Sequence, residues 1–556
     1  MTTTVETCTI GNYLCNRLHQ MGVTHIFGVP GDFSLKFCKL LEGDGRIQFV
    51  GTTREDTAGF AADGFARRHQ GIGIVLVTHG VGALSTVNPI AGANAESSPV
   101  LVISGAPGLR ERRENQLIHH NFGQNEAQKR IFENFTCCAV SLNDLSTAFK
   151  QIDLVLEKVW NNKKPGYLEI PRDLIEKEMP LHFDYEAFCS FEPSDTETLD
   201  EALSETVSLL KSAKTPAILA GVEIHRFGIQ EDLLQLVEHS KIPVAATIMG
   251  KTVIDECHPS YLGIYQGKVG GEAVRQTIEN ADVLVTLGVM FTDINLGMFT
   301  ARLNPNKMIR AHQGEVTIKH HRFPHITLCD FIRGLTRGLQ ETPSAGSSRK
   351  KPSGENGNLS HDKKKLDPLA SLTTSGIIDI LNTRMTPQIS VVCDTGDCLF
   401  AAAELKVPDR SSFFASAFYT TMGFAVPAGL GVQCASPNVR LVILVGDGAF
   451  QMTGTELSTY KKLGFTPVVI IINNGGYETE RVILDGAFND IENWNYGEVC
   501  NLLQYGKGAT TECVGDFEEA LDRALADKTQ MHVIDAVVSE SSQGMRRLAE
   551  EIGRRI

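Results

Sequence analysis

Two short groups of oxygen-bearing side chains follow apolar runs in the C-terminal third of the chain. Gly446-Asp447-Gly448 comes after RLVILV, and Asn473-Asn474 comes after PVVIII. A strand, a helix and a strand of this length bring both strand ends to one edge of a parallel sheet. Asp447 and Asn474 then offer two hard oxygen ligands, and the backbone of the Gly475-Gly476 turn can supply a third, which suits Mg²⁺. The helix expected over residues 449–464, beginning at Ala449, directs its N-terminal dipole toward a diphosphate.

The elements that position these residues are short aliphatic runs alternating with helix-length segments. Runs that are apolar on both faces are typical of strands buried in a parallel sheet. They stand at residues 25–29, 73–78, 100–105, 217–222, 282–289, 440–448 and 467–474. The alternation predicts three doubly wound α/β domains with mainly parallel sheets, spanning residues 1–185, 195–340 and 366–556. Residues 341–365 are rich in Ser, Gly, Pro and Lys and are expected to form a flexible linker.

Composition excludes several classes of protein. The chain has 556 residues and a formal net charge of −14, which disfavours a nucleic-acid partner. Its 13 cysteines contain no CxxC pair, so neither a disulfide framework nor a structural zinc site is expected. No signal sequence and no apolar run long enough to cross a membrane is visible. We expect a cytoplasmic enzyme without a membrane partner.

The GDG and NN groups, at this spacing, resemble the diphosphate and magnesium motif of thiamine diphosphate enzymes. The rest of the chain is similar to the 2-keto acid decarboxylases, which include pyruvate, indolepyruvate and phenylpyruvate decarboxylases. The resemblance covers nearly the whole chain and implies thiamine diphosphate and Mg²⁺ as cofactors. It implies a pyrimidine-binding first domain, a central domain and a diphosphate- and magnesium-binding third domain. It also implies a cofactor held between two subunits, hence at least a homodimer and commonly a homotetramer.

The resemblance also assigns cofactor contacts. Glu55, in Arg54-Glu55-Asp56, matches the glutamate that hydrogen-bonds the aminopyrimidine ring; the residues alone leave Asp56 as an even alternative. Met422 matches the bulky side chain that bends the cofactor, and the backbone of Thr420 is expected at the aminopyrimidine. The full expected cofactor set is Glu55, Thr78, Thr395, Thr420, Met422, Asp447, Gly448, Ala449, Asn474 and Gly476, of which Asp447, Asn474 and Gly476 also bind the metal.

Further acids and imidazoles match catalytic positions of the family. Asp32 follows the first apolar run, His119 and His120 stand in QLIHHNFGQ, and Glu480 lies shortly after the NN pair, with Glu478 as the runner-up. Together with Glu55 these residues form the expected catalytic set. Acids and imidazoles with separated pKa values suit the opposing proton transfers of a decarboxylase. Asp293 is expected near the site.

The expected reaction is non-oxidative decarboxylation of a 2-keto acid to an aldehyde and CO₂ through a thiamine diphosphate enamine. The segments at 422–434, 446–454 and 486–494 resemble the phenylpyruvate and indolepyruvate branch, which implies an aromatic or bulky substrate. The first alternative is a carboligase or acyloin synthase that uses the same enamine with a second carbonyl compound. An acetolactate synthase is disfavoured by the paired histidines. A catalytically silent binding subunit is the rival from another class, and the complete set of acids and histidines argues against it.

Overall fold

The structure is a computed structural model that describes residues 7–114, 116–181, 192–340 and 366–553. The linker predicted at 341–365 therefore lies outside the described residues. The chain divides into two compact units, each formed by several stretches. Unit 1 comprises Met1–Phe191, Gly423–Asn438 and Thr453–Phe465, and unit 2 comprises Glu192–Met422, Val439–Met452 and Thr466–Ile556. The predicted boundaries between the three domains stay predictions.

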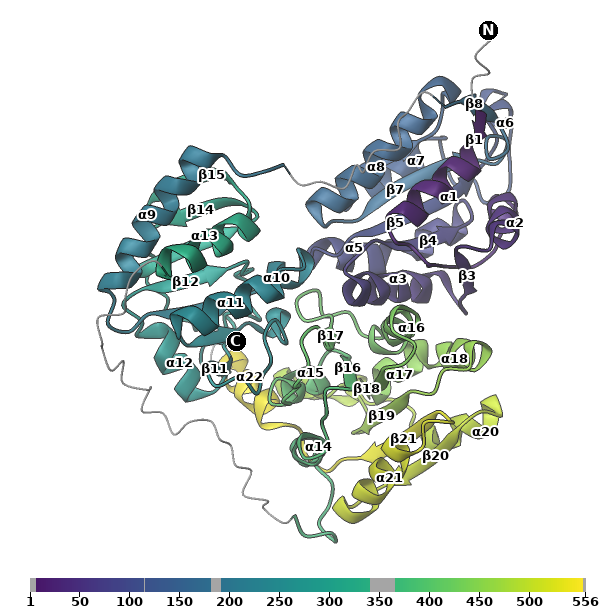
Figure 1. Cartoon of the computed structure of the whole chain (residues 1–556). Coiled ribbons are helices and arrows are strands. Elements are labelled where there is room, and N and C mark those ends of the chain that lie inside the picture. The colour runs from purple at the N-terminus through teal and green to yellow at the C-terminus, as the bar shows by residue number, and fades with distance from the viewer. Residues whose placement is uncertain (1–6, 115, 182–191, 341–365, 554–556) are drawn as a thin grey trace. The chain divides into compact units, whose positions relative to one another are not determined.

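The larger sheet of unit 1 has six strands, all parallel. Helices α1 (Ile10–Gln20) and α8 (Ala148–Asn162) share a core with one face, and α3 (Glu55–His69) packs on the other (Figure 1). Burial on both faces explains the uninterrupted aliphatic runs. In spatial order the strands are β3 (Gln48–Gly51), β2 (His25–Gly28), β4 (Gly73–Val77), β5 (Val100–Ala106), β7 (Gly166–Pro171) and β6 (Cys138–Ser141). The strands predicted from residues 25, 73 and 100 onward are confirmed.

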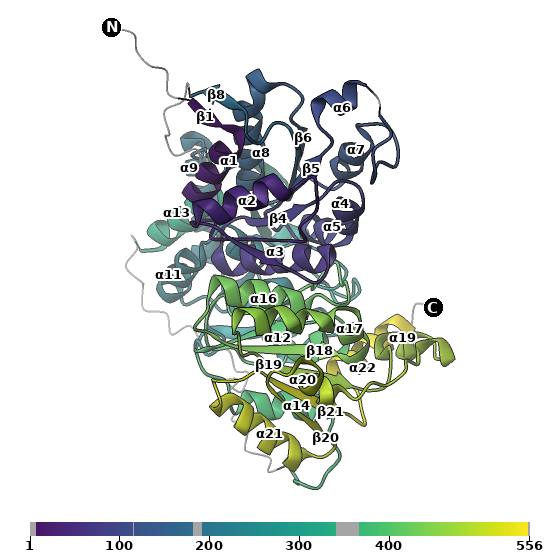
Figure 2. The ribbon, with the colours of Figure 1, turned by 90° about the vertical axis from the view of Figure 1, so that its right-hand side faces the viewer.

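Helix α3 of unit 1 packs along α16 (Ala425–Ala435), as Figure 2 shows. The two backbones approach closely, because a Cβ built on Gly64 would lie 2.1 Å from the carbonyl oxygen of Ala428. Buried Arg67 forms ion pairs with Asp63 at 2.7 Å and with Glu96 at 3.0 Å. Glycine at the crossing and the paired charges fix the helix that begins with Glu55.

Unit 2 contains a seven-stranded sheet built from residues 217–326. Four of its strand pairs are parallel, and two antiparallel strands follow at one edge. In spatial order the strands are β11 (Tyr261–Ile264), β10 (Val244–Ala246), β9 (Ala217–Ala220), β12 (Leu284–Leu287), β13 (Met308–His312), β14 (Gly314–Ile318) and β15 (His321–Ile326). The strands predicted at residues 217–222 and 282–289 are confirmed as β9 and β12.

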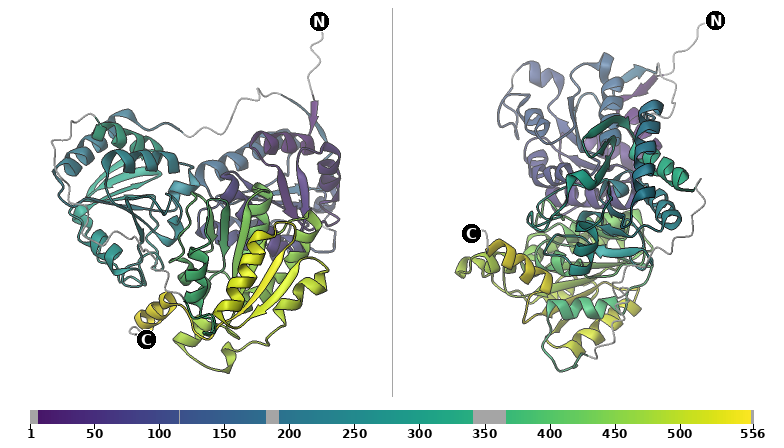
Figure 3. Two further views of the ribbon diagram at one scale, coloured as in Figure 1. Left: turned by 60° about the horizontal axis from the view of Figure 1, so that its bottom comes forward. Right: turned by 90° about the vertical axis from the view of Figure 1, so that its left-hand side faces the viewer.

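A second sheet of unit 2 has six parallel strands and carries the GDG and NN groups. Figure 3 (left) shows the yellow helix α21 (Val514–Ala526) lying on one of its faces. In spatial order the strands are β17 (Phe413–Ala415), β16 (Ile389–Cys393), β18 (Arg440–Gly446), β19 (Val468–Asn473), β21 (His532–Val537) and β20 (Lys507–Thr511). The α/β class with mainly parallel sheets is therefore confirmed.

The helix predicted over residues 449–464 is wrong in its bounds. Helix α17 (Asp447–Thr453) begins at Asp447 itself, and a 3₁₀ turn, η4 (Gly454–Glu456), separates it from α18 (Leu457–Leu463). The break has a tertiary cause, because the hydroxyl of Thr453 donates to the carbonyl of Gly423 at 2.9 Å. In the described part of the chain, no helix combines the length and apolar character needed to span a membrane.

Candidate active site

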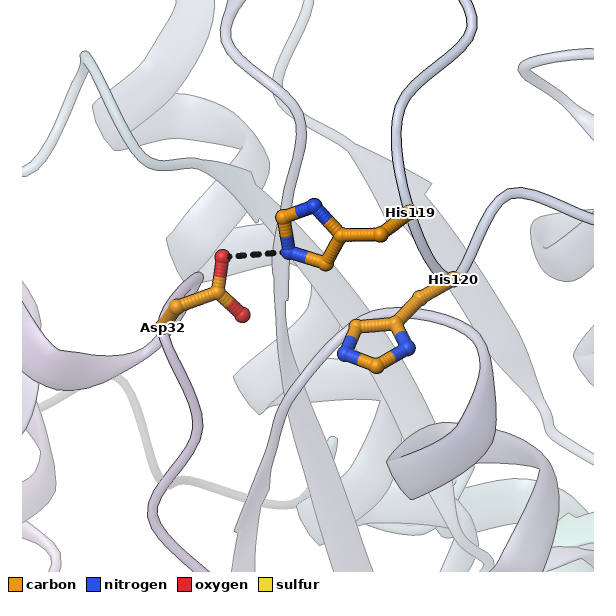
Figure 4. A group of neighbouring side chains, drawn as sticks. All are labelled: Asp32, His119 and His120. Atoms are coloured by element: carbon orange, nitrogen blue, oxygen red, sulfur yellow. Dashed lines mark hydrogen bonds and ion pairs between the residues drawn. The ribbon is translucent and has the colours of Figure 1, made fainter.

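The paired histidines and Asp32 lie together in unit 1. Asp32 stands in the loop after β2, and His119 and His120 stand in the segment between α6 (Leu109–Arg113) and α7 (Ala127–Glu133). Nε2 of His119 is hydrogen-bonded to Oδ2 of Asp32 at 2.8 Å (Figure 4). The two imidazole rings meet edge to face with centroids 4.7 Å apart. One carboxylate thus orients an imidazole, and the second imidazole lies beside it, which is an arrangement able to hold and pass a proton.

The turn after β4 holds the histidine segment in place. His120 has a φ of 66°, a left-handed conformation that is strained for a side chain other than glycine. A Cβ at Gly80 would lie 2.0 Å from the carbonyl oxygen of His120, so only glycine permits this approach. The N–H of Gly80 donates to Oε1 of buried Gln128 at 2.7 Å. These contacts constrain the backbone at His120.

Thr78 and Glu55 lie on the same side of the sheet of unit 1 as Asp32. A Cβ built on Gly31 would lie 2.4 Å from Cβ of Thr78. A Cβ built on Gly82 would lie 3.0 Å from Cγ2 of Thr78 and 3.6 Å from Oε1 of Glu55. Because β2, β3 and β4 are parallel, the residues that follow them gather at one edge. The hydroxyl oxygen of Thr78 is buried and has no hydrogen-bond partner among the described residues.

Glu55 and its neighbour Asp56 have different surroundings. Asp56 accepts two hydrogen bonds from the guanidinium of Arg54, at 3.0 and 2.9 Å, and one from the N–H of Thr57. Within the described ranges, the carboxylate of Glu55 forms no hydrogen bond or ion pair. Asp56 is therefore occupied as a capping group of α3, whereas Glu55 is available for a ligand.

Three side chains beside the histidines were not singled out from the sequence. Phe33 packs with its ring centroid 5.1 Å from that of His119 and 5.9 Å from that of His79. His79 is 4% exposed, and burial lowers its pKa. Arg172 lies after β7 with Nη1 3.8 Å from Oδ2 of Asp32. His79 and Arg172 directly follow apolar strands, which is the signal that could have found them.

Asp447 of unit 2 lies where β18 ends, facing the turn after β19. Its Oδ2 accepts the N–H groups of Gly475 at 2.7 Å and Gly476 at 3.1 Å, and its Oδ1 accepts that of Gly448 at 2.8 Å. Burial raises the pKa of Asp447, and these N–H donors oppose the rise. The spacing of GDG and NN thus brings the two strand ends together, as expected.

The oxygen atoms around Asp447 fit a hard cation. Oδ1 of Asn474 is buried and has no partner within the described residues. Arg481 donates hydrogen bonds to the carbonyls of Asn474 at 2.9 Å and of Gly475 at 2.8 Å, so both of these oxygens are engaged. The next carbonyl in the turn is that of Gly476. A buried carboxylate, an unsatisfied amide oxygen and a carbonyl form a donor set that Mg²⁺ prefers. The residues present therefore fit a magnesium ion.

The remaining residues expected at the cofactor also belong to unit 2. A Cβ at Gly448 would lie 2.5 Å from the ring of Tyr477, so packing requires glycine there, and Ala449 beside it is buried. Thr395 follows β16, and its N–H donates to Asp394 at 3.0 Å. Thr420 has a φ of 53°, which is strained for a β-branched residue, and Met422 is 39% exposed. Their roles at the cofactor stay predictions.

Helix α19 (Glu478–Ile483) carries both candidate acids after the NN pair. The carboxylate of Glu478 lies 3.7 Å from Nη1 of Arg481. The carboxylate of Glu480 forms no hydrogen bond or ion pair with any residue that the structure describes. Asp293 lies in a turn after β12, where its carboxylate accepts the N–H of Ile294 at 2.9 Å. Of these acids, Glu480 is the one available for proton transfer.

Comparisons with known proteins identify the class. The model of the thiamine pyrophosphate enzyme N-terminal TPP binding domain matches residues 8–131. The model of the central domain matches residues 203–339, and that of the C-terminal TPP binding domain matches residues 394–536. Each of these three regions contains strands of one of the sheets described above. The chain therefore has the three domains of a thiamine pyrophosphate enzyme.

Similar proteins narrow the class to a reaction type. Indole-3-pyruvate decarboxylase of Azospirillum brasilense is 33% identical over 527 residues, which cover 94% of each chain. Alpha-keto-acid decarboxylase of Mycobacterium leprae (strain TN) is 34% identical over 540 residues, covering 95% of this chain and 93% of the relative. That of Mycolicibacterium paratuberculosis is 32% identical over 541 residues, covering 95% and 94%. The chain belongs to the thiamine diphosphate-dependent 2-keto acid decarboxylases and is a carboxy-lyase.

Proposed function

We propose that this decarboxylase acts on an aromatic or bulky 2-keto acid, such as indolepyruvate or phenylpyruvate, and releases the aldehyde and CO₂. The observation that carries the proposal is the group formed by Asp32, His119 and His120 beside an available Glu55. The name of the Azospirillum brasilense relative, an indole-3-pyruvate decarboxylase, supports the choice of substrate. Release of an aldehyde requires proton delivery, and this group can supply it.

Unit 2 is proposed to hold Mg²⁺ and the diphosphate. Asp447, Asn474 and the carbonyl of Gly476 would bind the metal, which would offset the negative charge of the diphosphate. The unsatisfied Oδ1 of Asn474 supports this assignment, since a buried polar oxygen without a partner is costly unless a ligand satisfies it. Thiamine diphosphate, when bound, supplies the electron sink for the loss of CO₂.

Unit 1 is proposed to handle protons. Glu55 would donate a hydrogen bond to, or accept one from, a ring nitrogen of the cofactor, because its carboxylate has no partner among the residues that the structure describes. Nε2 of His119, bonded to Oδ2 of Asp32, would hold a proton in a fixed direction. His120 would exchange protons with the substrate, and Glu480 of unit 2 would serve as a further acid.

The oligomeric state is part of the proposal. We expect at least a homodimer and commonly a homotetramer, as the resemblance to the family implies. Light scattering of the purified protein measures this state directly, and a monomer at working concentrations would overturn the expectation.

A substrate panel tests the proposed reaction. The purified enzyme, with thiamine diphosphate and Mg²⁺, is given indolepyruvate, phenylpyruvate and pyruvate in separate reactions, and the products are identified. We expect the aldehydes of the two bulky acids, with a higher kcat/KM than for pyruvate. If an acyloin dominated, the enzyme would be a carboligase, and if pyruvate were preferred, the substrate class would be wrong.

A matched pair of variants tests the role of Glu55. Glu55→Gln is expected to lower kcat at least about 100-fold, the lower limit for a general acid–base group. Asp56→Asn removes the adjacent carboxylate, whose partners are Arg54 and Thr57, and is expected to retain most of the activity. Equal activity of Glu55→Gln and the wild type would reject the assignment.

A further inference from the structure

Three potential metal ligands of unit 1 meet at one point. One ligand atom each from Asp32, His119 and His120 lies within 4.8 Å of the other two. Figure 4 shows the carboxylate of Asp32 facing both imidazole rings. In a tetrahedral zinc site with bonds of about 2.1 Å, neighbouring ligand atoms lie about 3.4 Å apart. The 2.8 Å between Nε2 of His119 and Oδ2 of Asp32 is shorter than this spacing and the 4.8 Å limit of the group is longer, so the side chains would adjust on binding.

We propose that Asp32, His119 and His120 bind a divalent transition-metal ion, with Zn²⁺ as the preferred ion. Two imidazoles and one carboxylate are ligands for zinc, cobalt and nickel rather than for Mg²⁺, which requires oxygen ligands. Three protein ligands leave a fourth position for water, as in open zinc sites. This site is separate in chemistry from the oxygen ligands around Asp447.

The ligands are held in position before a metal arrives. The left-handed backbone of His120 and the close approach of Gly80 constrain the backbone from which the second imidazole projects. The ring of Phe33 contacts both imidazoles, with centroids 5.1 Å from His119 and 6.3 Å from His120. Strained backbone of this kind gathers at ligand clamps. Asp32 and His119 are exposed, so an ion can reach them from solvent.

Nearby charges permit a cation. Arg172 lies 3.8 Å from Asp32, but its guanidinium is paired with Glu111, with Nε donating to Oε2 at 3.1 Å. This neighbouring pair is neutral in sum, so the negative charge of Asp32 is not cancelled. His79 lies next to the group as a buried ring, and burial lowers its pKa, which disfavours a positive charge on this ring.

Bound metal would block proton transfer at this group. The ion occupies the lone pairs of the imidazoles and of the carboxylate, and these atoms can then neither accept nor deliver a proton. Inhibition therefore rests on the function proposed above, whereas metal binding itself does not. Zinc would act as a reversible inhibitor that a chelator removes.

Metal binding is measured directly on the tag-free holoenzyme, loaded with thiamine diphosphate and excess Mg²⁺. Zn²⁺ is titrated by calorimetry, and Co²⁺ by its visible absorption, which is intense only for tetrahedral ligation. We expect one ion per chain. His119→Ala, His120→Ala and Asp32→Asn should each weaken Zn²⁺ binding at least about tenfold, since even loss of a supporting group around a metal site costs that much.

The chain offers a matched control in its other adjacent histidine pair, His320 and His321, which are exposed near the β14–β15 turn. The double variant of this pair to Ala should bind Zn²⁺ as the wild type does. Absence of zinc binding by the wild type, or unchanged binding by all three site variants, would overturn the proposal. An enzyme that binds zinc through these residues but decarboxylates no 2-keto acid would reject the proposed substrate class and leave the metal site standing.

Discussion

Replacing Asp447 by Asn tests the cation site of unit 2. The side chain of Asp447 is 1% exposed, and burial raises its pKa, so a nearby cation would favour its charged form. Asn preserves the shape but removes the charge. It also places an amide donor against the N–H of Gly448, or against those of Gly475 and Gly476, which donate to the two carboxylate oxygens.

The expected magnitude follows from linkage between binding and folding. Ligands at 100 times their Kd stabilise the folded state by about 2.7 kcal/mol. Loss of one charged ligand costs about 1.5–3 kcal/mol, so binding weakens up to about 100-fold. At the same ligand concentration the variant then gains only about 0.4 kcal/mol. The ligand-dependent stabilisation should therefore fall by about 2.3 kcal/mol.

The assay is thermal unfolding with and without thiamine diphosphate and Mg²⁺. Asp535→Asn is the control, because Asp535 in β21 is also a buried carboxylate whose pKa is raised by burial. Asp535 accepts a hydrogen bond from Nδ2 of Asn473 at 3.0 Å and is not a proposed metal ligand. We expect this control to keep the ligand-induced rise in unfolding temperature, whereas Asp447→Asn loses most of it.

A full ligand-induced rise in Asp447→Asn would refute the assignment of Asp447 as a metal ligand. If both variants lost the ligand-induced rise in unfolding temperature, the effect would follow from any change of buried charge in this sheet and not from Asp447 in particular. Only loss confined to Asp447→Asn supports the cation site.

Three further predictions concern unit 1. Glu456→Gln removes the carboxylate that accepts hydrogen bonds from the N–H and hydroxyl of Thr53, at 3.1 and 2.6 Å. The loop before α3 should then shift, and kcat should fall by about 10- to 100-fold. Unchanged steady-state kinetics would reject this positioning role of Glu456. Burial lowers the pKa of His79, so the folded wild type should lose stability as pH falls below about 6.5, where the unfolded chain binds the proton more readily. Between neutral pH and about pH 5.5, the unfolding temperature of His79→Phe should fall less than that of the wild type. Equal losses in the two proteins would contradict the burial of a neutral ring. Gly64→Ala, whose Cβ would lie 2.1 Å from a carbonyl oxygen of α16, should destabilise the folded protein by about 1–3 kcal/mol. Gly43→Ala lies in helix α2 (Leu35–Asp44), where a Cβ meets nothing within 4 Å, and should instead stabilise the folded protein by about 0.5–1 kcal/mol. Thermal unfolding that ranks the two variants in the opposite order would refute the packing argument.

The strands could be predicted because burial on both faces is written into local composition. The run that forms β19 is aliphatic up to its last residue, and such a run is typical of a strand buried on both faces of a parallel sheet. The approach of Asp447 to the Gly475-Gly476 turn followed from the same reasoning, since parallel strands end at one edge. The two groups are separated by a single strand–helix–strand unit, so their approach could be predicted without knowing the rest of the fold.

The choice between neighbouring acids needed more than local pattern. Asp56 and Glu55 are adjacent carboxylates, and only the structure shows that Asp56 is bonded to Arg54. Glu478 likewise lies near Arg481. Which carboxylate remains available depends on the direction of each side chain from its helix, which the residue type does not specify.

The amino-acid sequence by itself therefore determined the α/β class and the positions of the predicted strands, because both rest on local composition. Its motifs also resembled the family to which the comparisons assign the chain. The tertiary structure alone decided that the long helix breaks at Thr453, where a hydroxyl bonds Gly423. It alone placed Glu456 against Thr53, 403 residues away in the chain, and Arg172 beside Asp32. Such contacts depend on the path of the whole backbone, and no local periodicity encodes that path.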